Sequence, residues 1–443
     1  MARDTKATSL REAGVVLIDC DHRTPPPANE GYPYVAIPQL KQGRLDLTEA
    51  RRITREHFEE WTRKARPQPY DVVLSRRCNP GETAFVPHGL ECALGQNLVL
   101  LRADGKKVFP PFLRWLVRGP QWWAQIGKFI NVGAVFDSLK CADIPNFCLP
   151  LPSLAEQEAI AHVLGTLDDK IELNRRMNET LEAMVRAIFK SWFVDFDPVR
   201  AKAAGRKPAD MDAATAALFP AAFQDSPIGP VPKGWPVERF GQHITAVRGL
   251  SYNGEGLRDD RTGLPMHNLN SIYEGGGYKH EGIKYYAGEY RDKHLLKPGD
   301  MIVTNTEQGF DHLLIGHAAI VPERYGPQGL FSHHIYRVRP KPSSPFSTNY
   351  LVELFNTPRW HSWISGFSNG TTINMLPPDA LEMPMLAVPP PELVSTFTAL
   401  AASVHGATEM NLDQSRTLAA LRDALLPKLL SGKLPVNAAE EVS

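Results

Sequence analysis

Residues 153–192 read SLAEQEAIAHVLGTLDDKIELNRRMNETLEAMVRAIFKSW, and one stripe of side chains recurs along them at alternating gaps of four and three residues. Ser153 with Glu156 forms a capping box, which marks the start of a helix. The repeating positions are Ile160, Leu164, Leu167, Ile171, Asn174, Asn178, Leu181, Val185, Ile188 and Trp192. Such a stripe is typical of a coiled-coil seam, here with a polar centre. At 1.5 Å per residue it spans about 50 Å, which predicts one long helix.

A second stripe of the same kind appears 237 residues later. It consists of Phe397, Ala401, Val404, Thr408, Asn411, Ser415, Leu418, Arg422, Leu425 and Leu429. Asn411 and Ser415 occupy the places of Asn174 and Asn178, so the centre is again polar. Two such helices would pair most simply with each other, antiparallel and in one register. The alternative is that each is an ordinary amphipathic helix that lies on its own domain.

The sequence outside the stripes also contains an internal repeat. Residues 120–131 and 358–369 share proline, tryptophan, isoleucine, phenylalanine and asparagine at a shift of 238. Residues 70–74 resemble 299–303 at a smaller shift, so loop lengths differ there. A unit this long that occurs twice is a duplicated module, because solenoid repeats run about 20–50 residues. Two related modules in one chain imitate a symmetric dimer.

The modules mix short apolar runs, Gly/Pro turns and aromatic helical stretches, which favours an α/β or α+β fold. We therefore expect two similar globular domains separated by two long antiparallel coiled-coil helices, with a pseudo-twofold internal repeat. The expected parts are a first globular domain over 1–150, a first long helix over 151–197, a Pro/Ala-rich connector over 198–234, a second globular domain over 235–390, a second long helix over 391–434 and a tail over 435–443.

The charge balance hides a local difference. The 443 residues include 49 Lys and Arg against 49 Asp and Glu, which argues against a protein that coats nucleic acid or membrane by bulk charge. Residues 1–150 nevertheless hold 21 basic and 16 acidic residues, whereas residues 231–390 are neutral. The first module is therefore the more basic of the two.

The sequence also indicates a cytoplasmic protein. No apolar stretch near the N-terminus resembles a signal peptide, and no segment approaches a membrane-spanning length. The five cysteines form no Cys-x-x-Cys pair, so neither a disulfide framework nor a zinc site is indicated. We expect reduced thiols, several of them in the core.

Motifs for independent catalysis are missing from the sequence. It contains no Gly-x-x-x-x-Gly-Lys-Ser/Thr loop and no His-Glu-x-x-His. Asn79-Pro80 is followed by Gly81, not by the second proline and aromatic residue that resemble an amino-methyltransferase site. We therefore expect no catalytic residue, no metal site and no cofactor bound by this chain.

Polar residues follow a buried-looking strand at the corresponding place in both modules. The candidate DNA contacts are Arg76, Arg77, Asn79, Asn305 and Gln308. Arginine can read guanine bidentately or clamp a phosphate, and asparagine can read adenine. An equally weighted interpretation is a polar loop that caps a strand.

Several segments occur in the order found in one protein family. PLPSLAEQEAIAHVLGTLDDKIELN at 150–174 closely resembles the first central region of type I restriction-modification specificity subunits. FKSWFVDFDP at 189–198 looks like the end of that region, and SPIGPVPKGW at 226–235 is similar to the lead-in of a target-recognition domain. LPKLLSGKL at 426–434 resembles the C-terminal ending of the family. With the duplication, the likeness covers most of residues 30–434.

This resemblance implies a non-catalytic, sequence-specific DNA-binding subunit of a type I restriction endonuclease and adenine methyltransferase complex. Each globular domain would be a target-recognition domain that reads one half of a bipartite double-stranded target. The helical pair would set the unread spacer and dock the modification subunits. The family further implies modification subunits that bind S-adenosylmethionine and restriction subunits that use ATP and Mg. Base flipping and methyl transfer would occur in those partners.

The likeness has departures, and other functions stay open. Residues 1–30 lack the Gly-x-x-Pro-x-Gly-Trp lead-in and are left without a role. Residues 132–136 and 370–374 differ between the modules, as expected if the modules read different sequences. The family shares no base-contacting motif, so no base contact is carried over. The alternatives are a self-contained DNA methyltransferase and a two-domain protein-interaction adaptor.

Overall fold

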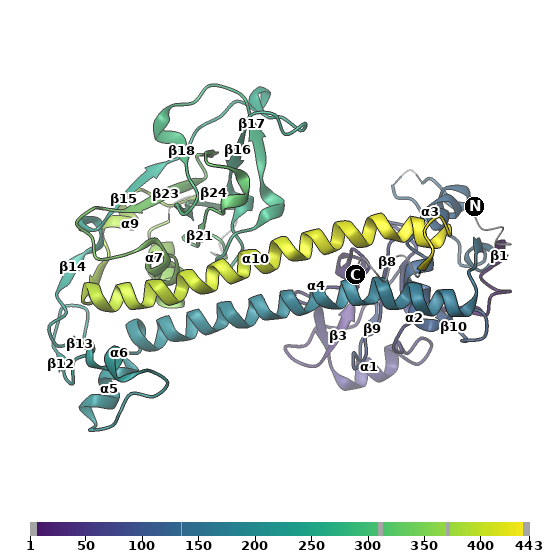
Figure 1. The fold of residues 1–443 in the computed structure, drawn as a ribbon, viewed down its shortest axis with the longest axis horizontal. Helices are drawn as coiled ribbons and strands as arrows, with labels where there is room; N and C mark the ends of the chain where they lie inside the picture. Colours follow the sequence, from purple (N-terminus) through teal and green to yellow (C-terminus); the bar gives the residue numbers. More distant parts are fainter. Residues whose placement is uncertain (1–6, 134, 309–312, 369–372, 437–443) are drawn as a thin grey trace. The chain divides into compact units, whose positions relative to one another are not determined.

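The structure is a computed structural model that describes residues 7–133, 135–308, 313–368 and 373–436 (Figure 1). Its contacts group the chain into two compact units, Met1–Asn174 with Asp413–Ser443 and Arg175–Leu412. Both units mix helices with short strands, so the fold is of the mixed α/β kind. No helix within the described ranges is long and apolar enough to cross a membrane.

The first unit is built on a four-stranded antiparallel sheet. Its strands, in spatial order, are β2 (Val15–Asp19), β10 (Leu98–Ala103), β7 (Val72–Ser75) and β8 (Thr83–Phe85). The smaller pairings are β6 (Arg51–Ile53) with β3 (Tyr32–Val35) and β9 (Ala93–Leu94), β1 (Ala7–Ser9) with β11 (Cys148–Pro150), and β4 (Leu40–Lys41) with β5 (Arg44–Leu45). The helices of its globular part are α1 (Arg55–Trp61), α2 (Pro110–Leu116) and α3 (Pro120–Phe129).

Strand β7 shows why this sheet is buried on both faces. Val72, Val73 and Leu74 are all fully buried, a continuous apolar run of the kind that is covered on both sides. Val72 and Leu74 belong to the cluster that contains Trp122, whereas Val73 belongs to a separate cluster with Leu100. The strand thus places its last residues at the edge of a rigid core.

The second unit also contains a four-stranded antiparallel sheet. Its main antiparallel sheet runs in the order β15 (Ile244–Arg248), β23 (Ile335–Pro340), β19 (Met301–Thr304) and β21 (Ala318–Ile320). A second sheet contains β17 (Lys284–Tyr286), β16 (Leu264–His267), β22 (Gly329–Phe331) and β18 (Leu295–Leu296). The other elements are β14 (Val237–Arg239), β20 (Thr306–Gln308), β24 (Ile373–Met375), β25 (Met385–Ala387), α7 (Thr348–Phe355), α8 (Pro358–Ser365) and α9 (Asp379–Glu382).

Residues 1–30, which the sequence left without a role, include the strands that begin the first unit. Strand β1 pairs antiparallel with β11, and β2 forms one edge of the main sheet. In the second unit β14 pairs antiparallel with β25, and β15 forms the corresponding edge. In both units, therefore, an early strand pairs with the strand that leads into a long helix.

The segment expected to be a connector contains short elements. The α-helical part of the first long helix, α4, covers Leu154–Phe189 and passes into a π-helical turn over Lys190–Val194. The helices α5 (Asp197–Ala203) and α6 (Ala213–Ala217) follow, and then β12 (Phe223–Gln224) pairs with β13 (Val231–Pro232).

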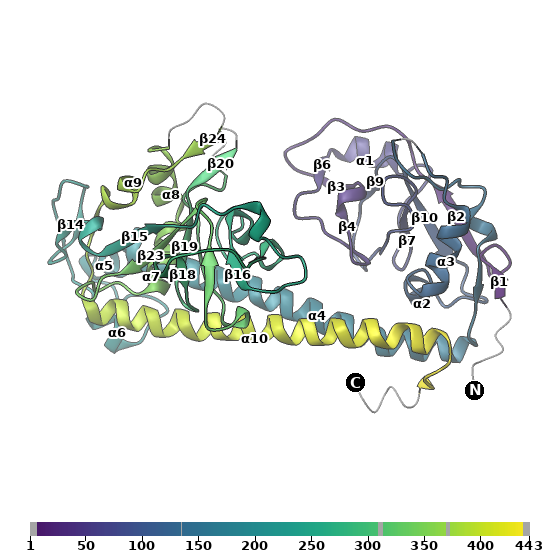
Figure 2. The ribbon, with the colours of Figure 1, turned by 90° about the horizontal axis from the view of Figure 1, so that it is seen from above.

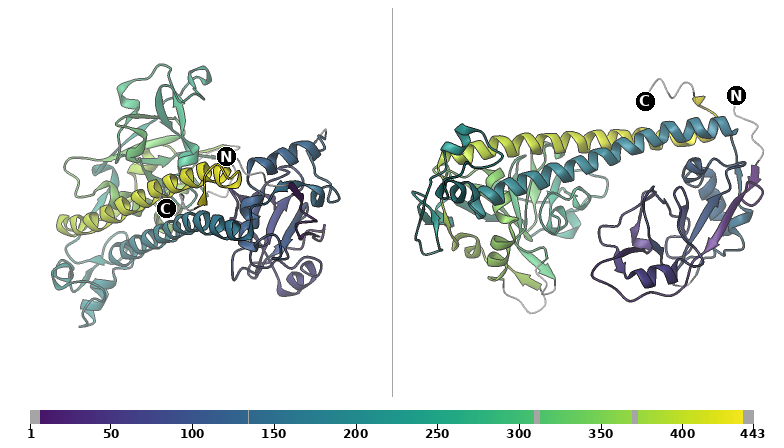
Figure 3. Two further views of the ribbon diagram at one scale, coloured as in Figure 1. Left: turned by 45° about the vertical axis from the view of Figure 1, so that its right-hand side comes forward. Right: turned by 90° about the horizontal axis from the view of Figure 1, so that it is seen from below.

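Helix α4 and helix α10 (Pro391–Leu430) contact each other within each unit (Figures 1 and 3). In the first unit Asn174 Nδ2 donates to Ser415 Oγ at 3.2 Å. In the second unit Asn411 Nδ2 donates to Asn178 Oδ1 at 2.8 Å, and the rings of Phe189 and Phe397 lie 5.3 Å apart. Residue numbers rise on one helix as they fall on the other, so the paired segments run antiparallel. Every position of both sequence stripes is buried or half-buried.

Candidate nucleic-acid interface

The first candidate contacts lie in the turn between β7 and β8. Ser75 ends the buried strand, and the Gly81 amide donates to the Ser75 carbonyl at 3.0 Å, which closes the turn. Cys78 has a φ of 64°, a left-handed conformation that is uncommon for a residue other than glycine. The tight turn exposes Arg77 and Asn79 to solvent.

Arg76 and Arg77 have different surroundings. Arg76 is half-buried, its Nη1 is 3.4 Å from the Leu139 carbonyl, and its Nε is buried without a partner among the described residues. Arg77 is exposed, and its guanidinium carbon lies 5.5 Å from the centre of the Phe136 ring. Arg77 therefore offers free donors to a ligand, whereas Arg76 is held against the protein.

The segment after α3 lies beside this turn. An isolated antiparallel bridge joins Arg77 to Ser138, and another joins Asn131 to Ser138. The backbone amides and carbonyls of Asn131 and Ser138 exchange hydrogen bonds of 2.8 and 3.0 Å. The sequence comparison of 132–136 with 370–374 had pointed to this segment, yet none of its residues was selected as a contact.

In the second unit Asn305 is fully buried, immediately after β19. Its Nδ2 donates to the His333 carbonyl at 3.0 Å, its backbone amide to the His334 carbonyl at 3.0 Å, and its own carbonyl accepts from the Leu376 amide at 2.8 Å. The Asn305 side-chain nitrogen is therefore bonded inside the protein, and its Oδ1 is buried without a partner among the described residues. Gln308 ends β20, and its side chain lies outside the described part of the chain.

Sequence reasoning missed the exposed groups around Asn305. Arg248 is exposed at the end of β15, and its Nε donates to the His333 carbonyl at 3.1 Å while its Nη2 lies 3.5 Å from Met375 Sδ. The rings of His333 and His334 are 3.8 Å apart. Burial, and then the neighbouring His333, lowers the pKa of His334, which keeps this imidazole neutral at pH 7. The sequence did not indicate Arg248, because it lies 57 residues before Asn305. The two residues come near each other only because β15 and β19 belong to the same sheet.

Strands β20 and β24 pair antiparallel beside this position (Figure 2). Glu307 of β20 is buried, and its carboxylate accepts from the amides of Leu313, Leu314 and Ile315 at 2.8 to 3.1 Å. The two candidate regions are thus equivalent. The first region follows β7 and contacts the segment after α3. The second region follows β19 and contacts the segment after α8. Both strands are third in the order of their four-stranded sheets.

The predicted helix-pair residues lie in the core of one of the two units, at the polar centre, or at half-buried positions. Ile160, Leu164 and Leu167 pack in the core of the first unit with Leu425, and Val185 packs in the core of the second. Among the centre residues, Asn178 Nδ2 donates to the Thr408 carbonyl at 3.1 Å. The remaining stripe members, Ile171, Leu181, Ile188 and Leu418, are half-buried.

An unpredicted ion-pair cluster surrounds Asp168 of α4. Its carboxylate is buried and accepts from Arg422 Nη1 of α10 at 2.5 Å. Arg114 Nη1 and Arg44 Nη2 lie 3.5 and 3.6 Å from the other carboxylate oxygen. Asp168 therefore links both helices to α2 and to strand β5 within the first unit.

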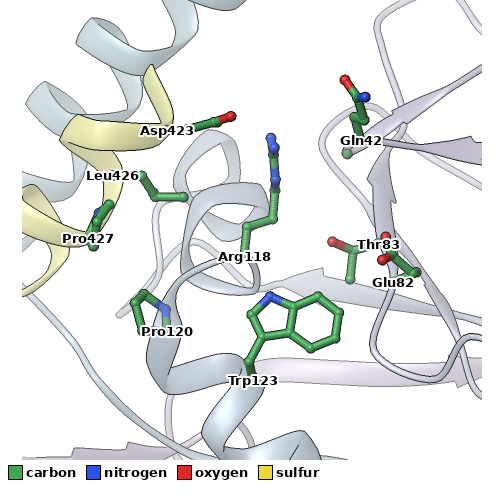
Figure 4. Close-up of a pocket in the computed structure, with 10 residues that line it drawn as sticks. Gln42, Glu82, Thr83, Arg118, Pro120, Trp123, Asp423, Leu426 and Pro427 are labelled. Atoms are coloured by element: carbon green, nitrogen blue, oxygen red, sulfur yellow. The ribbon is translucent and has the colours of Figure 1, made fainter. Parts of the chain in front are cut away.

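A cavity of about 370 Å³ lies near this cluster in the first unit (Figure 4). Arg118 extends into it, and Asp423 and Leu426 of α10 form part of its wall. Burial, and then the nearby Arg422, lowers the pKa of Arg118. The cavity therefore lies between the globular part of the first unit and α10.

Among the described residues, Asp19, Cys20 and His22 are close enough to suggest a metal site. Cys20 Sγ is buried and donates to the carbonyls of Gly95 and Leu98 at 3.2 and 2.9 Å. Burial raises the pKa of this thiol to about 12, so the thiolate that a metal requires is disfavoured. The group does not fit a metal centre.

Comparisons with known proteins give the family. Residues 25–183 match the type I restriction modification DNA specificity domain. The chain is 24% identical over 415 residues to the type I restriction enzyme HindI specificity subunit of Haemophilus influenzae, covering 82% of this chain and 86% of that protein. It is 24% identical over 403 residues to the MjaIX specificity subunit of Methanocaldococcus jannaschii, covering 87% and 82%.

A solved structure supports the same fold. The type I restriction-modification S subunit from M. genitalium aligns with a TM-score of 0.52 at 13% identity, covering 96% of both chains. Residues 25–183 therefore belong to the type I restriction-modification DNA specificity domain family, and the chain as a whole is a relative of the type I specificity subunits.

Proposed function

We propose that this chain is the DNA-reading subunit of a type I restriction-modification complex, in which each unit reads one half of a bipartite target. The observation that carries the proposal is an exposed arginine beside a similar segment in each unit. Arg77 follows β7 and bridges to Ser138 after α3, whereas Arg248 ends the edge strand β15 and contacts Met375 of β24, after α8. An exposed arginine next to a segment that differs between the two modules suits direct readout of base edges.

In this proposal the paired helices act as the spacer and as the docking element. A rigid helical pair would fix how many base pairs separate the half-sites, one turn of DNA being about 34 Å. The modification subunits would dock on helix faces outside the seam, where residues such as Arg175, Glu182 and Asp413 are exposed.

The chemistry is assigned to partners and not to this chain. Methyltransferase subunits would bring S-adenosylmethionine and flip the target adenine, and translocase and nuclease subunits would bring ATP and Mg. The absence of a P-loop motif from the sequence agrees with this assignment. The partner subunits would also supply some of the contacts to the DNA phosphates. This fits a chain that has equal numbers of acidic and basic residues.

The experiment uses the chain co-expressed with its modification subunits and maps methylated adenines across the host genome. The wild type is expected to give a split motif that disappears when the gene is deleted. Arg77→Ala is expected to relax or weaken the first half of the motif, at about 1–3 kcal/mol for a lost bidentate contact, and to leave the second half unchanged. The matched control is Arg63→Ala, an exposed arginine of the same unit outside the candidate region.

Two other functions would give different results. A self-contained methyltransferase would transfer methyl groups from S-adenosylmethionine to DNA with no partner present. An adaptor would assemble with the modification subunits but confer no salt-sensitive, sequence-dependent binding of DNA.

A further inference from the structure

Three large apolar side chains are exposed next to Arg77. Val132 is 83% exposed, Val135 86% and Phe136 43%, all within the segment that follows α3. Single exposed apolar residues are common, but three on one turn mark a binding surface. We call these three residues the apolar tip.

The two ends of the segment that carries the apolar tip are held by backbone hydrogen bonds. The Asn131–Ser138 bridge closes its base, and the Leu139 amide donates to the Arg76 carbonyl at 2.8 Å, which fastens it to the β7–β8 turn. A Cβ added at Gly133 would lie 2.4 Å from the Phe136 carbonyl oxygen, so glycine is required for this close approach.

The surroundings of the tip favour DNA as its ligand. The Arg77 guanidinium lies over the Phe136 ring, and Lys140 is exposed four residues further along the chain. Asp137 is half-buried and its carboxylate accepts from the Gly133 amide, so the exposed charged groups of this region are cations. In the second unit an exposed arginine also contacts an exposed apolar side chain, Arg248 with Met375, although Arg248 ends the edge strand β15. An arginine donor beside an apolar side chain matches a base-pair edge that presents an acceptor beside a thymine methyl group.

We propose that the apolar tip, through Val135 and Phe136, contacts a thymine 5-methyl group in the half of the target read by the first unit, beside the groups bound by Arg77. This inference rests on the proposed function and adds to it the base feature that is read. It makes Val135 and Phe136 specificity-determining residues.

The test replaces thymine by uracil, which lacks only the 5-methyl group. The complex of this chain with its modification subunits is bound to duplexes of its mapped target, with each thymine of the first half replaced in turn. The wild type is expected to lose about fourfold in affinity at one position, the value for one buried methyl group. The double variant V135S/F136S is expected to bind thymine and uracil duplexes equally.

Two controls make the comparison specific. Val16→Ser removes an exposed valine of the same unit on β2 and should keep the full thymine preference. Uracil in the second half of the target should affect the wild type and V135S/F136S alike.

The inference is wrong if no thymine of the first half matters to the wild type, or if V135S/F136S keeps the wild-type preference. It is also wrong if V135S/F136S fails to assemble with the modification subunits while Val16→Ser assembles, because the tip would then be a protein-docking surface. If the wild-type complex shows no sequence-dependent binding at all, the proposed function fails together with the inference.

Discussion

Asp168 is buried and forms ion pairs with three arginines, Arg422, Arg114 and Arg44. Its negative charge should therefore be essential to the stability of the first unit. We expect Asp168→Asn to destabilise the chain by about 3–5 kcal/mol, because the largely buried Arg114 loses its ion pair with Asp168. Arg422 and Arg44 would keep their second ion-pair partners, Asp423 and Glu172. Denaturant unfolding of the purified chain measures this loss. Asp169→Asn is the matched control, since Asp169 is exposed on the same turn of α4. Equal stability of the two variants would show that the cluster contributes nothing.

Glu353 should make the stability of the second unit depend on pH. It is buried on α7, with His405 Nε2 3.9 Å away, and burial raises the pKa of its carboxyl from 4.5 to about 7. The charge of Arg186 lowers this pKa, and the charge of Glu182 raises it. The folded state therefore holds a proton that the unfolded state has released, so stability falls as pH rises from about 4.5 to about 7.

The loss over that interval is expected to be at most about 3 kcal/mol. Thermal unfolding measured across it should show a flatter profile for Glu353→Gln than for the wild type. Glu289→Gln, at an exposed position of the same unit, should keep the wild-type slope. A Glu353→Gln profile as steep as that of the wild type would contradict the assignment.

Exposure differs among the residues that the sequence selected as candidate DNA contacts. Arg77 and Asn79 are exposed as a DNA contact requires, because a turn after a buried strand must point outward. Asn305 is buried instead, because the strand that follows Thr304 brings its amide under the His333 carbonyl. That difference depends on which strands become neighbours, and residue type alone does not contain it.

At the scale of elements, the polar centre of the helix pair should specify register. Asn178 accepts from Asn411 and donates to the Thr408 carbonyl, so it uses both ends of its amide. We expect Asn178→Leu to lower the free energy of unfolding by about 1–2 kcal/mol, because these two groups lose their partner. The double variant N178L/N411L should recover that loss through apolar packing, at the expense of a unique register.

Thermal unfolding of the two single variants and the double variant forms a double-mutant cycle. A coupling energy near zero would mean that the two asparagines do not interact across the pair. Leu173→Ala, at an exposed position on the same helix, provides the control for a surface change.

The long helices could be predicted because their signal is local. Gaps of three and four residues place Ile160, Leu164 and Leu167 on one face whatever else the chain does. The sheets could not, because the order β2-β10-β7-β8 joins residues some 80 positions apart, such as Asp19 and Val99. For the same reason the pairing of β1 with β11 was invisible, and residues 1–30 had no role in the sequence interpretation.

At the scale of the whole molecule, the two units and the helix pair would have separate roles if the proposed function holds. The target would be set by three separable parts, namely two readers and one spacer. Substitutions in one of the two units should change the bases that are recognised and leave the distance between the half-sites unchanged. Changes in the helices should alter that distance without altering the bases.

Inserting one heptad into each helix at the polar centre, after Asn174 in α4 and before Asp413 in α10, tests this separation. Seven residues preserve the seam and add about 10 Å of helix, which corresponds to about three base pairs of DNA. We expect methylation mapping to find both half-sites unchanged and the unread spacer longer by about three base pairs. Insertion into α4 alone should break the pairing of the stripes and abolish methylation, because the two helices would no longer match in length. An unchanged spacer with both insertions present would mean that the helices do not set the distance between the readers.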